Sequence, residues 1–189
     1  MGLSEYYNQQ QKYSQGMYII FTALSKLPAS EKKKTRASLQ IMMGNILLEF
    51  FKYNSNLIRV ANLDEKPDKE IEELTQYINT KDLVFENSDV IFPSNKVYKN
   101  KAEITELFKM AMTQYKKALE IYELDGFVTE HCNIVKRMSE LYKVMADLED
   151  DFNRIYAMGL KRSQLIKPLF DEISPKHFIG LWRVNLPFS

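Results

Sequence analysis

The stretch from Asn100 to Glu149 decides the fold, and its centre reads Tyr115-Lys-Lys-Ala-Leu-Glu-Ile-Tyr-Glu-Leu-Asp-Gly-Phe-Val-Thr-Glu-His131. Apolar residues recur at steps of three and four on both sides of Asp125-Gly126, which predicts two amphipathic helices joined by a turn. Gly126 can take the left-handed conformation that closes a helix end, and Thr129 is the predicted N-cap of the second helix. A short turn brings two such helices back antiparallel, so we predict a helical hairpin.

Further helices are predicted on both sides of this hairpin. Residues 4–26 and about 31–59 form one pair, with Pro28 ending the first helix and Ser30 capping the second. A helix at about 151–171 follows the central hairpin, with Pro168 expected to kink or shorten it. Ser174-Pro175 then starts a last helix in the favoured order of cap and first-turn proline. The apolar stripe of the 151–171 helix consists of Phe152, Ile155, Tyr156, Gly159, Ile166 and Phe170.

Residues 60–99 have a different character and interrupt the helical pattern. Pro67 sits well as a first helical residue, so we predict one short helix over 68–78. Leu83-Val-Phe and Val90-Ile-Phe are predicted as brief strands or extended segments. The whole chain is therefore expected to be all-α and one continuous domain: a hairpin over 1–59, a long connecting segment over 60–99, and hairpins over 100–189.

Composition restricts the possible classes of partner. The chain has 189 residues, of which 45% are hydrophobic and 27% charged, as in a folded globular domain. Its net charge of +1 argues against nucleic acid as the main partner. The N-terminus lacks the features of a signal peptide, no apolar run is long enough to span a bilayer, and Cys132 has no second cysteine to pair with. We therefore expect a cytoplasmic protein without membrane insertion.

No pattern of catalytic or metal-binding residues stands out. The phosphate-binding loop, the nucleophile elbow and the Cys-x-x-Cys motif are all missing from the sequence. His131 and Cys132 are adjacent, so on a helix they point about 100° apart and cannot readily share a metal ion. Glu149-Asp150-Asp151 could hold a cation, but carboxylates at a helix start are explained more simply by the helix dipole. We expect no enzyme activity, no cofactor and no metal.

Two basic clusters are the candidate partner-binding residues. The first consists of Lys32, Lys33, Lys34 and Arg36. Positive charge in the first turn of a helix opposes the helix dipole, so this cluster is present despite a small local cost. It is either a solvated face or a patch that meets an acidic protein surface. Lys161 and Arg162, with Lys167, form a second and weaker cluster of the same kind.

Several segments resemble the KIF-binding protein family. They are Glu106-Leu-Phe, the run from Leu124 to His131, Leu141-Tyr-Lys-Val-Met-Ala-Asp-Leu-Glu, and Lys161-Arg-Ser-Gln-Leu-Ile-Lys-Pro-Leu. The resemblance covers about 102–185 well and 6–57 more weakly. It implies antiparallel hairpins stacked as a short tetratricopeptide-like solenoid, matching the middle-to-C-terminal part of a longer protein. The residues that define this fold are Tyr115, Tyr122, Asp125, Gly126, Val128, Thr129 and His131.

The resemblance also implies a function. Members of this family bind the motor domains of certain kinesins and keep them off microtubules, using the concave side of the solenoid. A kinesin motor domain in the cytoplasm, near the cytoskeleton, is thus the expected partner. The alternative is a truncated relative that serves as a permanent structural subunit of a larger microtubule, ciliary or other assembly.

Overall fold

The computed structural model describes residues 13–28, 33–63, 98 and 100–173. Over these ranges the chain forms five helices and no strand, which confirms the all-α class. The helices are α2 (Tyr13–Lys26), α3 (Lys33–Leu63), α5 (Lys101–Leu119), α6 (Val128–Ala146) and α7 (Phe152–Glu172). The short helix and strands predicted within 60–99, and the helix predicted after Ser174, lie outside the described residues, apart from the end of α3.

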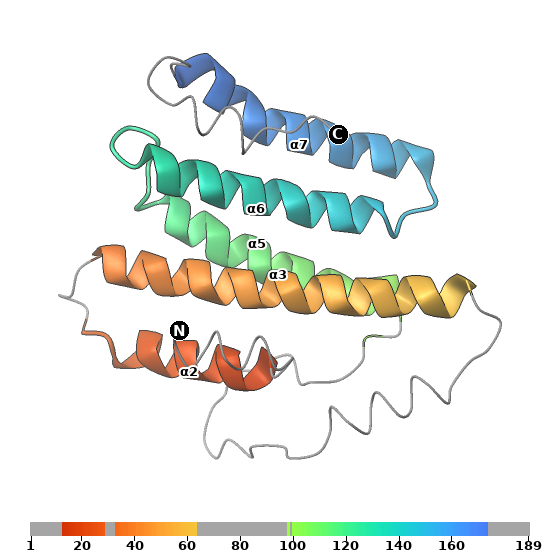
Figure 1. Ribbon diagram of the computed structural model, residues 1–189, viewed down its shortest axis with the longest axis horizontal. Helices are drawn as coiled ribbons and strands as arrows, with labels where there is room; N and C mark the ends of the chain where they lie inside the picture. The colour runs from red at the N-terminus through yellow and green to blue at the C-terminus, as the bar shows by residue number, and fades with distance from the viewer. Residues whose placement is uncertain (1–12, 29–32, 64–97, 99, 174–189) are drawn as a thin grey trace.

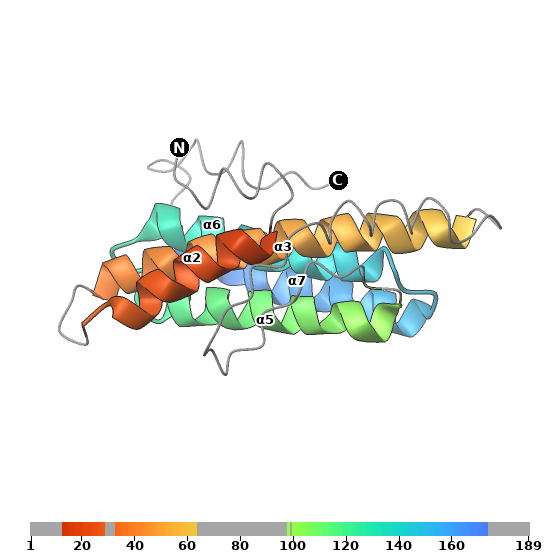
Figure 2. The ribbon, with the colours of Figure 1, turned by 90° about the horizontal axis from the view of Figure 1, so that it is seen from below.

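The helices stack side by side, and each runs antiparallel to the one before it (Figure 1). The long helix α3 lies at the centre, where it packs most extensively on α5 and also on α2 and α6. Helix α6 in turn carries α7. Figure 2 shows α3 and α6 on the upper side and α5 and α7 on the lower side, so these four helices form two layers. This arrangement of alternating helices is solenoid-like, as predicted.

Side-chain caps fix where two of the helices begin. The Asn100 side chain accepts a hydrogen bond of 2.9 Å from the backbone N–H of Glu103, which caps α5. Asp151 does the same for α7 by accepting one of 2.9 Å from the backbone N–H of Asn153. Each cap satisfies one of the N–H groups that a helix start leaves without a partner. Helix α3 continues to Leu63, past its predicted end at residue 59.

The turn between α5 and α6 confirms the hairpin but differs from the prediction in detail. Gly126 adopts a φ of 108°, so a glycine is needed there, but it lies in the loop and does not close α5, which already ends at Leu119. The predicted N-cap Thr129 is wrong, because α6 starts at Val128 and Phe127 occupies the cap position without a side-chain hydrogen bond. Packing of the Phe127 ring against Tyr122 fixes this end instead, with ring centroids 5.4 Å apart.

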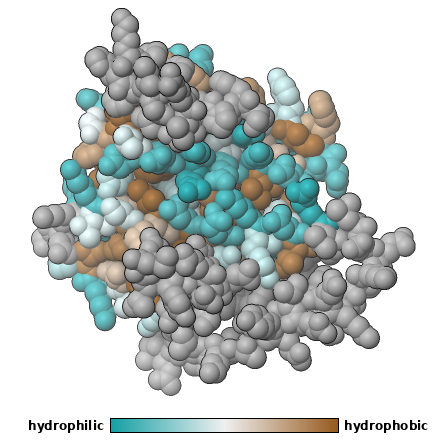
Figure 3. All heavy atoms as spheres, in the orientation of Figure 1, coloured by the Kyte–Doolittle hydropathy of each residue, from teal (hydrophilic) through white to brown (hydrophobic). Residues whose placement is uncertain are grey.

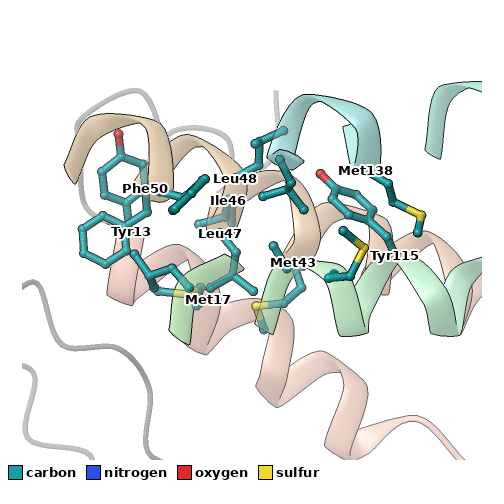
Figure 4. Packing of buried hydrophobic residues seen from close by; sticks show 14 of the residues in the cluster. Tyr13, Met17, Met43, Ile46, Leu47, Leu48, Phe50, Tyr115 and Met138 are labelled. Carbon is teal, nitrogen blue, oxygen red and sulfur yellow. The ribbon is translucent and has the colours of Figure 1, made fainter. Parts of the chain in front are cut away.

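The main hydrophobic core joins α2, α3, α5 and α6. Figure 4 shows Tyr13 and Phe50 at one end of the view and Tyr115 and Met138 at the other. Tyr13 of α2 stacks on Phe50 of α3 with ring centroids 4.8 Å apart. Tyr115 of α5 is fully buried, and its hydroxyl donates a hydrogen bond of 2.8 Å to Asn45 Oδ1 of α3. The main core therefore joins α2, α5 and α6 to α3, and a second, smaller cluster lies between α6 and α7.

A buried asparagine holds the chain where it returns to the stack ahead of α5. Asn54 on α3 is fully buried. Its Oδ1 accepts a hydrogen bond of 3.0 Å from the backbone N–H of Tyr98, and its Nδ2 donates one of 2.9 Å to the Phe50 carbonyl. Tyr98 is itself buried, with its ring edge against Phe50. The amide oxygen thus satisfies a buried backbone N–H outside any helix, while its Nδ2 adds a second donor to a carbonyl within α3.

Candidate protein-binding surfaces

The first basic cluster lies at the start of α3, next to the turn between α5 and α6. The Lys34 ammonium lies 4.4 Å from the centre of the Phe127 ring, a cation–π contact. The Arg36 guanidinium donates a hydrogen bond of 3.4 Å to the Leu27 carbonyl near the end of α2. Lys33 is exposed, whereas Lys32 lies outside the described residues. Two members of the cluster therefore contribute to the packing of the fold, and Lys33 projects into solvent.

Tyr122 and His131, two of the residues predicted to define the fold, lie at the same end of the stack. The Tyr122 hydroxyl lies 2.8 Å from the Ser38 hydroxyl of α3 and donates to the Lys34 carbonyl at 3.4 Å. His131 Nδ1 lies 2.8 Å from the Tyr122 carbonyl, which joins the first turn of α6 to the loop. These contacts join the turn between α5 and α6 to the start of α3.

In the second basic cluster, too, one side chain contributes to the packing of the fold and another is exposed to solvent. Arg162 Nε donates a hydrogen bond of 3.2 Å to the Ser139 hydroxyl, which links α7 to α6. Lys161 is exposed and forms no hydrogen bond or ion pair within the described part of the chain. The first cluster lies at the start of α3, whereas Lys161 and Arg162 lie midway along α7, which packs mainly on α6 (Figure 1), so the structure does not bring the two clusters together.

A groove between α5 and α7, which we call the cationic groove, contains Lys161. It has a volume of about 610 Å³, and Met145 of α6 and Met158 of α7 contribute apolar surface to it. Lys101, Arg154 and Lys161 line it together with a single carboxylate, Glu149. Sequence analysis missed Lys101 and Arg154, because they are 53 residues apart and only the packing of α5 and α7 on α6 brings them together.

Two cations of the groove already pair with its carboxylate. Glu149 forms an ion pair with Lys101 and a second with Arg154, whose Nη1 lies 3.5 Å from Oε2. The hydrogen bond from Lys101 is the main reason that the pKa of Glu149 lies below its usual value. The carboxylate side chain is only 5% exposed, whereas the Arg154 side chain remains 66% exposed. With three cations and one carboxylate, the groove carries a net charge of about +2.

Helix α7 turns only part of its predicted stripe inward: Ile166 packs against the cluster around Cys132, but the residues of its first turns do not. Leu169 is buried against Cys132 and Val135 of α6, and Met158 and Leu165 pack against the main core. The predicted stripe residues Phe152, Ile155 and Tyr156 are instead 77%, 37% and 66% exposed. Leu160 is 49% exposed beside them. Phe152, Ile155, Tyr156 and Leu160 together form what we call the apolar stripe of α7.

The part of the described surface that faces the viewer in Figure 3 is mainly polar. Figure 3 shows hydrophilic side chains over the middle of the described face, with small hydrophobic areas between them. Among the described residues, no group of three His, Cys, Asp or Glu side chains could hold a metal ion. None of the described helices has the length and hydropathy to cross a bilayer. Cys132 is buried between α6 and α7, and burial raises the pKa of its thiol.

A stack of antiparallel helices defines a solenoid-like all-α protein, an architecture that commonly offers extended surfaces to other proteins. Comparison with known families identifies the particular family within this class. The family model described as "KIF-1 binding protein C terminal" matches residues 1–186. The chain belongs to this family, and the match includes residues 60–99, where the sequence alone had shown no resemblance.

Individual relatives agree with the family. A KIF-binding protein of Gallus gallus is 26% identical over 96% of this chain and 36% of its own length. Those of Homo sapiens and Dictyostelium discoideum are 32% and 27% identical over 41% and 44% of the chain. The chain thus spans about a third of the length of the first of these relatives. No solved structure matches it.

Proposed function

We propose that this chain is a non-enzymatic scaffold that binds a kinesin motor domain and limits its attachment to microtubules. The observation that carries the proposal is membership of a family whose relatives are named KIF-binding proteins. A preformed stack of helices supports it, because a rigid surface loses little conformational entropy when a partner binds. The site of action is the cytoplasm, in association with the cytoskeleton.

The partner contacts that we propose come from the basic clusters, namely Lys32, Lys33, Lys34, Arg36, Lys161 and Arg162. Lys33 and Lys161 are the best tests, because both are exposed and neither makes a hydrogen bond or ion pair to another described residue. Exposed charges act mainly on association rate and respond to salt. Replacing either by Glu is thus expected to weaken binding without unfolding the chain.

Affinity capture of the tagged chain from its own cells is the first experiment. Recovery of a kinesin, followed by loss of microtubule co-sedimentation of its purified motor domain when the chain is added, is the expected result. Lys33→Glu and Lys161→Glu should each weaken this effect, whereas Lys109→Glu, an exposed charge midway along α5, serves as a charge-matched control. Normal co-sedimentation of the motor in the presence of excess folded chain would contradict the proposal.

A permanent structural subunit of a larger assembly is the second candidate function. The observation in its favour is the apolar stripe of α7, because exposed aromatic side chains on one helix face commonly mark a contact surface. In that case the capture would recover a fixed set of microtubule, ciliary or other complex components in equal amounts, and no motor. This outcome would replace the first candidate.

A further inference from the structure

We propose that the chain's own residues 174–189 turn back along α7 and cover its apolar stripe. Three observations carry the inference: a row of apolar residues that leads from the end of α7 to the stripe, the length and composition of residues 174–189, and the charges at the two ends of the row. The proposal does not rest on kinesin binding. It makes the stripe an internal contact, which a partner protein reaches only by displacing residues 174–189.

The row of apolar residues follows α7 from its end to the stripe. An α-helix turns by about 100° per residue, so five apolar positions of α7 and its C-cap fall within a sector of about 60°. They are Phe152, Ile155, Ile166, Phe170 and Ile173. The last three of these are buried or half-buried, whereas the first two are exposed and have exposed Tyr156 and Leu160 beside them. The uncovered part of the row thus lies in line with the point at which the chain leaves α7.

The chain leaves α7 in a conformation that lets it turn back. Ile173 has φ −93° and ψ 119°, so the backbone is already extended at this residue. Ser174-Pro175, the predicted start of another helix, follows directly. Each described helix runs antiparallel to the one before it (Figure 1), and a short connection favours the same arrangement here. Residues 174–189 would then run from the end of α7 toward its start.

Residues 174–189 are long enough to reach the stripe. Leu160 lies about 20 Å along α7 from Ile173, and Phe152 lies about 32 Å from it. Sixteen residues span about 24 Å as a helix and about 50 Å when fully extended. They reach Leu160 in either form, and they reach Phe152 when their last residues are extended.

The composition of residues 174–189 suits an apolar contact. Seven of the 16 are large apolar residues: Phe178, Ile179, Leu181, Trp182, Val184, Leu186 and Phe188. Aromatic rings and branched aliphatic side chains of this kind pack well on the exposed rings of Phe152 and Tyr156. Covering both surfaces removes apolar area from water on each side of the contact.

The charges at the two ends of the row also favour this segment. Residues 174–189 include Lys176 and Arg183 but neither Asp nor Glu. Exposed carboxylates lie at both ends of α7, opposed on the side of the stripe by the exposed cation of Lys167. These carboxylates belong to Asp150, Asp151, Asp171 and Glu172. A basic segment along α7 therefore meets more negative than positive charge at the ends of the row.

Residues 64–97 match the stripe less well. They contain nine Asp or Glu and four Lys, so they would bring negative charge toward Asp150 and Asp151, which is unfavourable. Arg154 and Lys161 could attract them, but both cations lie about 140–160° around α7 from Tyr156. Acidic residues drawn to the cationic groove would therefore leave the stripe uncovered.

Trp182, the only tryptophan of the chain, reports whether residues 174–189 are packed. In the full chain we expect it to be shielded from acrylamide. Replacing Tyr156 and Leu160 together by Ser should raise its quenching constant at least about threefold, because the contact loses two large apolar groups. Met17→Ala removes a buried side chain at the opposite end of the stack and should leave the constant unchanged.

Two results of the quenching experiment would overturn the proposal. The first is a Trp182 that acrylamide quenches in the unaltered chain as strongly as free tryptophan. The second is a quenching constant that does not change when Tyr156 and Leu160 are replaced. Both residues are exposed, so the double variant should keep the circular dichroism of the unaltered chain.

A disulfide trap in a Cys132→Ser background identifies which segment lies on the stripe. Leu186 lies as far after Ile173 as Leu160 lies before it, so Leu160→Cys with Leu186→Cys should form an intrachain disulfide on mild oxidation. Lys109→Cys with Leu186→Cys, which uses an exposed site on α5, should form one at least about tenfold more slowly. Equal rates for the two pairs would overturn the proposal.

The same trap tests the other occupants of the stripe. Faster disulfide formation by Leu160→Cys with Phe85→Cys would assign the stripe to residues 64–97. An interchain disulfide of Leu160→Cys alone, formed at low protein concentration, would assign it to a second copy of the chain. Either result overturns the proposal.

Discussion

A single missing side chain lets α3 and α5 approach each other. A Cβ atom at Gly44 would lie only 2.7 Å from Cε1 of the fully buried Tyr115 ring. We therefore predict that Gly44→Ala lowers the free energy of unfolding by about 1–3 kcal/mol, the usual cost of overpacking a core. Chemical denaturation followed by circular dichroism measures it.

Gly159→Ala is the matched control for this prediction. Gly159 also lies within a helix, but a Cβ there would meet nothing within 4 Å. The substitution should stabilise α7 by about 0.5–1 kcal/mol, because alanine restricts the unfolded chain and favours the helix. A similar loss of stability in both variants would mean that the contact with Tyr115 is not the cause.

Asn54 permits a second prediction at the residue scale. Asn54→Ala leaves the buried backbone N–H of Tyr98 without its acceptor, so the free energy of unfolding should fall by about 1–3 kcal/mol. Asn56→Ala, an exposed change two residues further along α3, should alter it by less than about 0.5 kcal/mol. Thermal melts of the two variants make the comparison, and equal melting temperatures would refute the role of the amide.

Sequence analysis identified these residues but not their contacts. Gly44 and Tyr115 both fit a helical period, and periodicity reports only which residues share a face of one helix. That the tyrosine ring rests on the glycine depends on the packing of two helices whose contact residues are 71 positions apart. A local sequence pattern does not indicate a contact between residues so far apart in the chain.

At the scale of elements, a charged network joins α3 to α6. Lys52 of α3 lies 2.6 Å from Glu140 of α6 and 2.9 Å from Glu49, and Arg137 adds a contact of 3.1 Å to Glu140. Burial alone would raise the pKa of Glu140, but the hydrogen bonds and charges of Lys52 and Arg137 outweigh it and lower the pKa. The network therefore favours the ionised carboxylate in the folded chain.

This shift in pKa predicts how stability depends on pH. A carboxylate whose pKa is lowered on folding stabilises the chain above its unfolded pKa of about 4.5, and this contribution is lost as the pH falls through the lower folded pKa. Glu140→Gln should thus cost about 1 kcal/mol at pH 7 and close to nothing at pH 3. Urea denaturation at both values of pH measures the difference.

The ion pair itself can be isolated with a double-variant cycle. If the pair with Lys52 is responsible, Lys52→Met combined with Glu140→Gln should lose little more stability at pH 7 than either change alone. Fully additive losses would show that each residue stabilises the chain separately, and the attribution to the pair would fail.

Helix α7 shows where prediction from sequence stops at this scale. Its bounds follow closely from the sequence, which predicted about 151–171, but its apolar residues lie on two sides. Spacing alone could not decide whether Tyr156 or Leu169 faces the core. Contacts with α6 decide which side of α7 faces the core: Leu169 packs against Cys132, and Arg162 donates a hydrogen bond to Ser139. The apolar stripe and half of the cationic groove were therefore not foreseen as a surface.

For the molecule as a whole, the number of helices that each helix contacts predicts which helix separates from the stack most easily. Helix α3 contacts three other helices, whereas α7 at the end of the stack packs mainly on α6. In stacked helical proteins, stability is approximately a sum of the contributions of neighbouring elements, so a terminal helix can open by itself. The contact between α7 and α6 includes a separate small cluster of Cys132, Val135, Leu169 and Ile173.

Cys132, the only cysteine of the chain, is a built-in probe of this opening. Its side chain is 4% exposed in the closed state, so a thiol reagent can react only after α7 has moved away. Leu169→Ala should destabilise that contact by about 2 kcal/mol and accelerate labelling about 30-fold. Met17→Ala removes a fully buried side chain from α2, at the other end of the stack, and should leave the labelling rate nearly unchanged. If both variants accelerate labelling equally, Cys132 becomes accessible only through global unfolding, and α7 is not an independent unit of the stack.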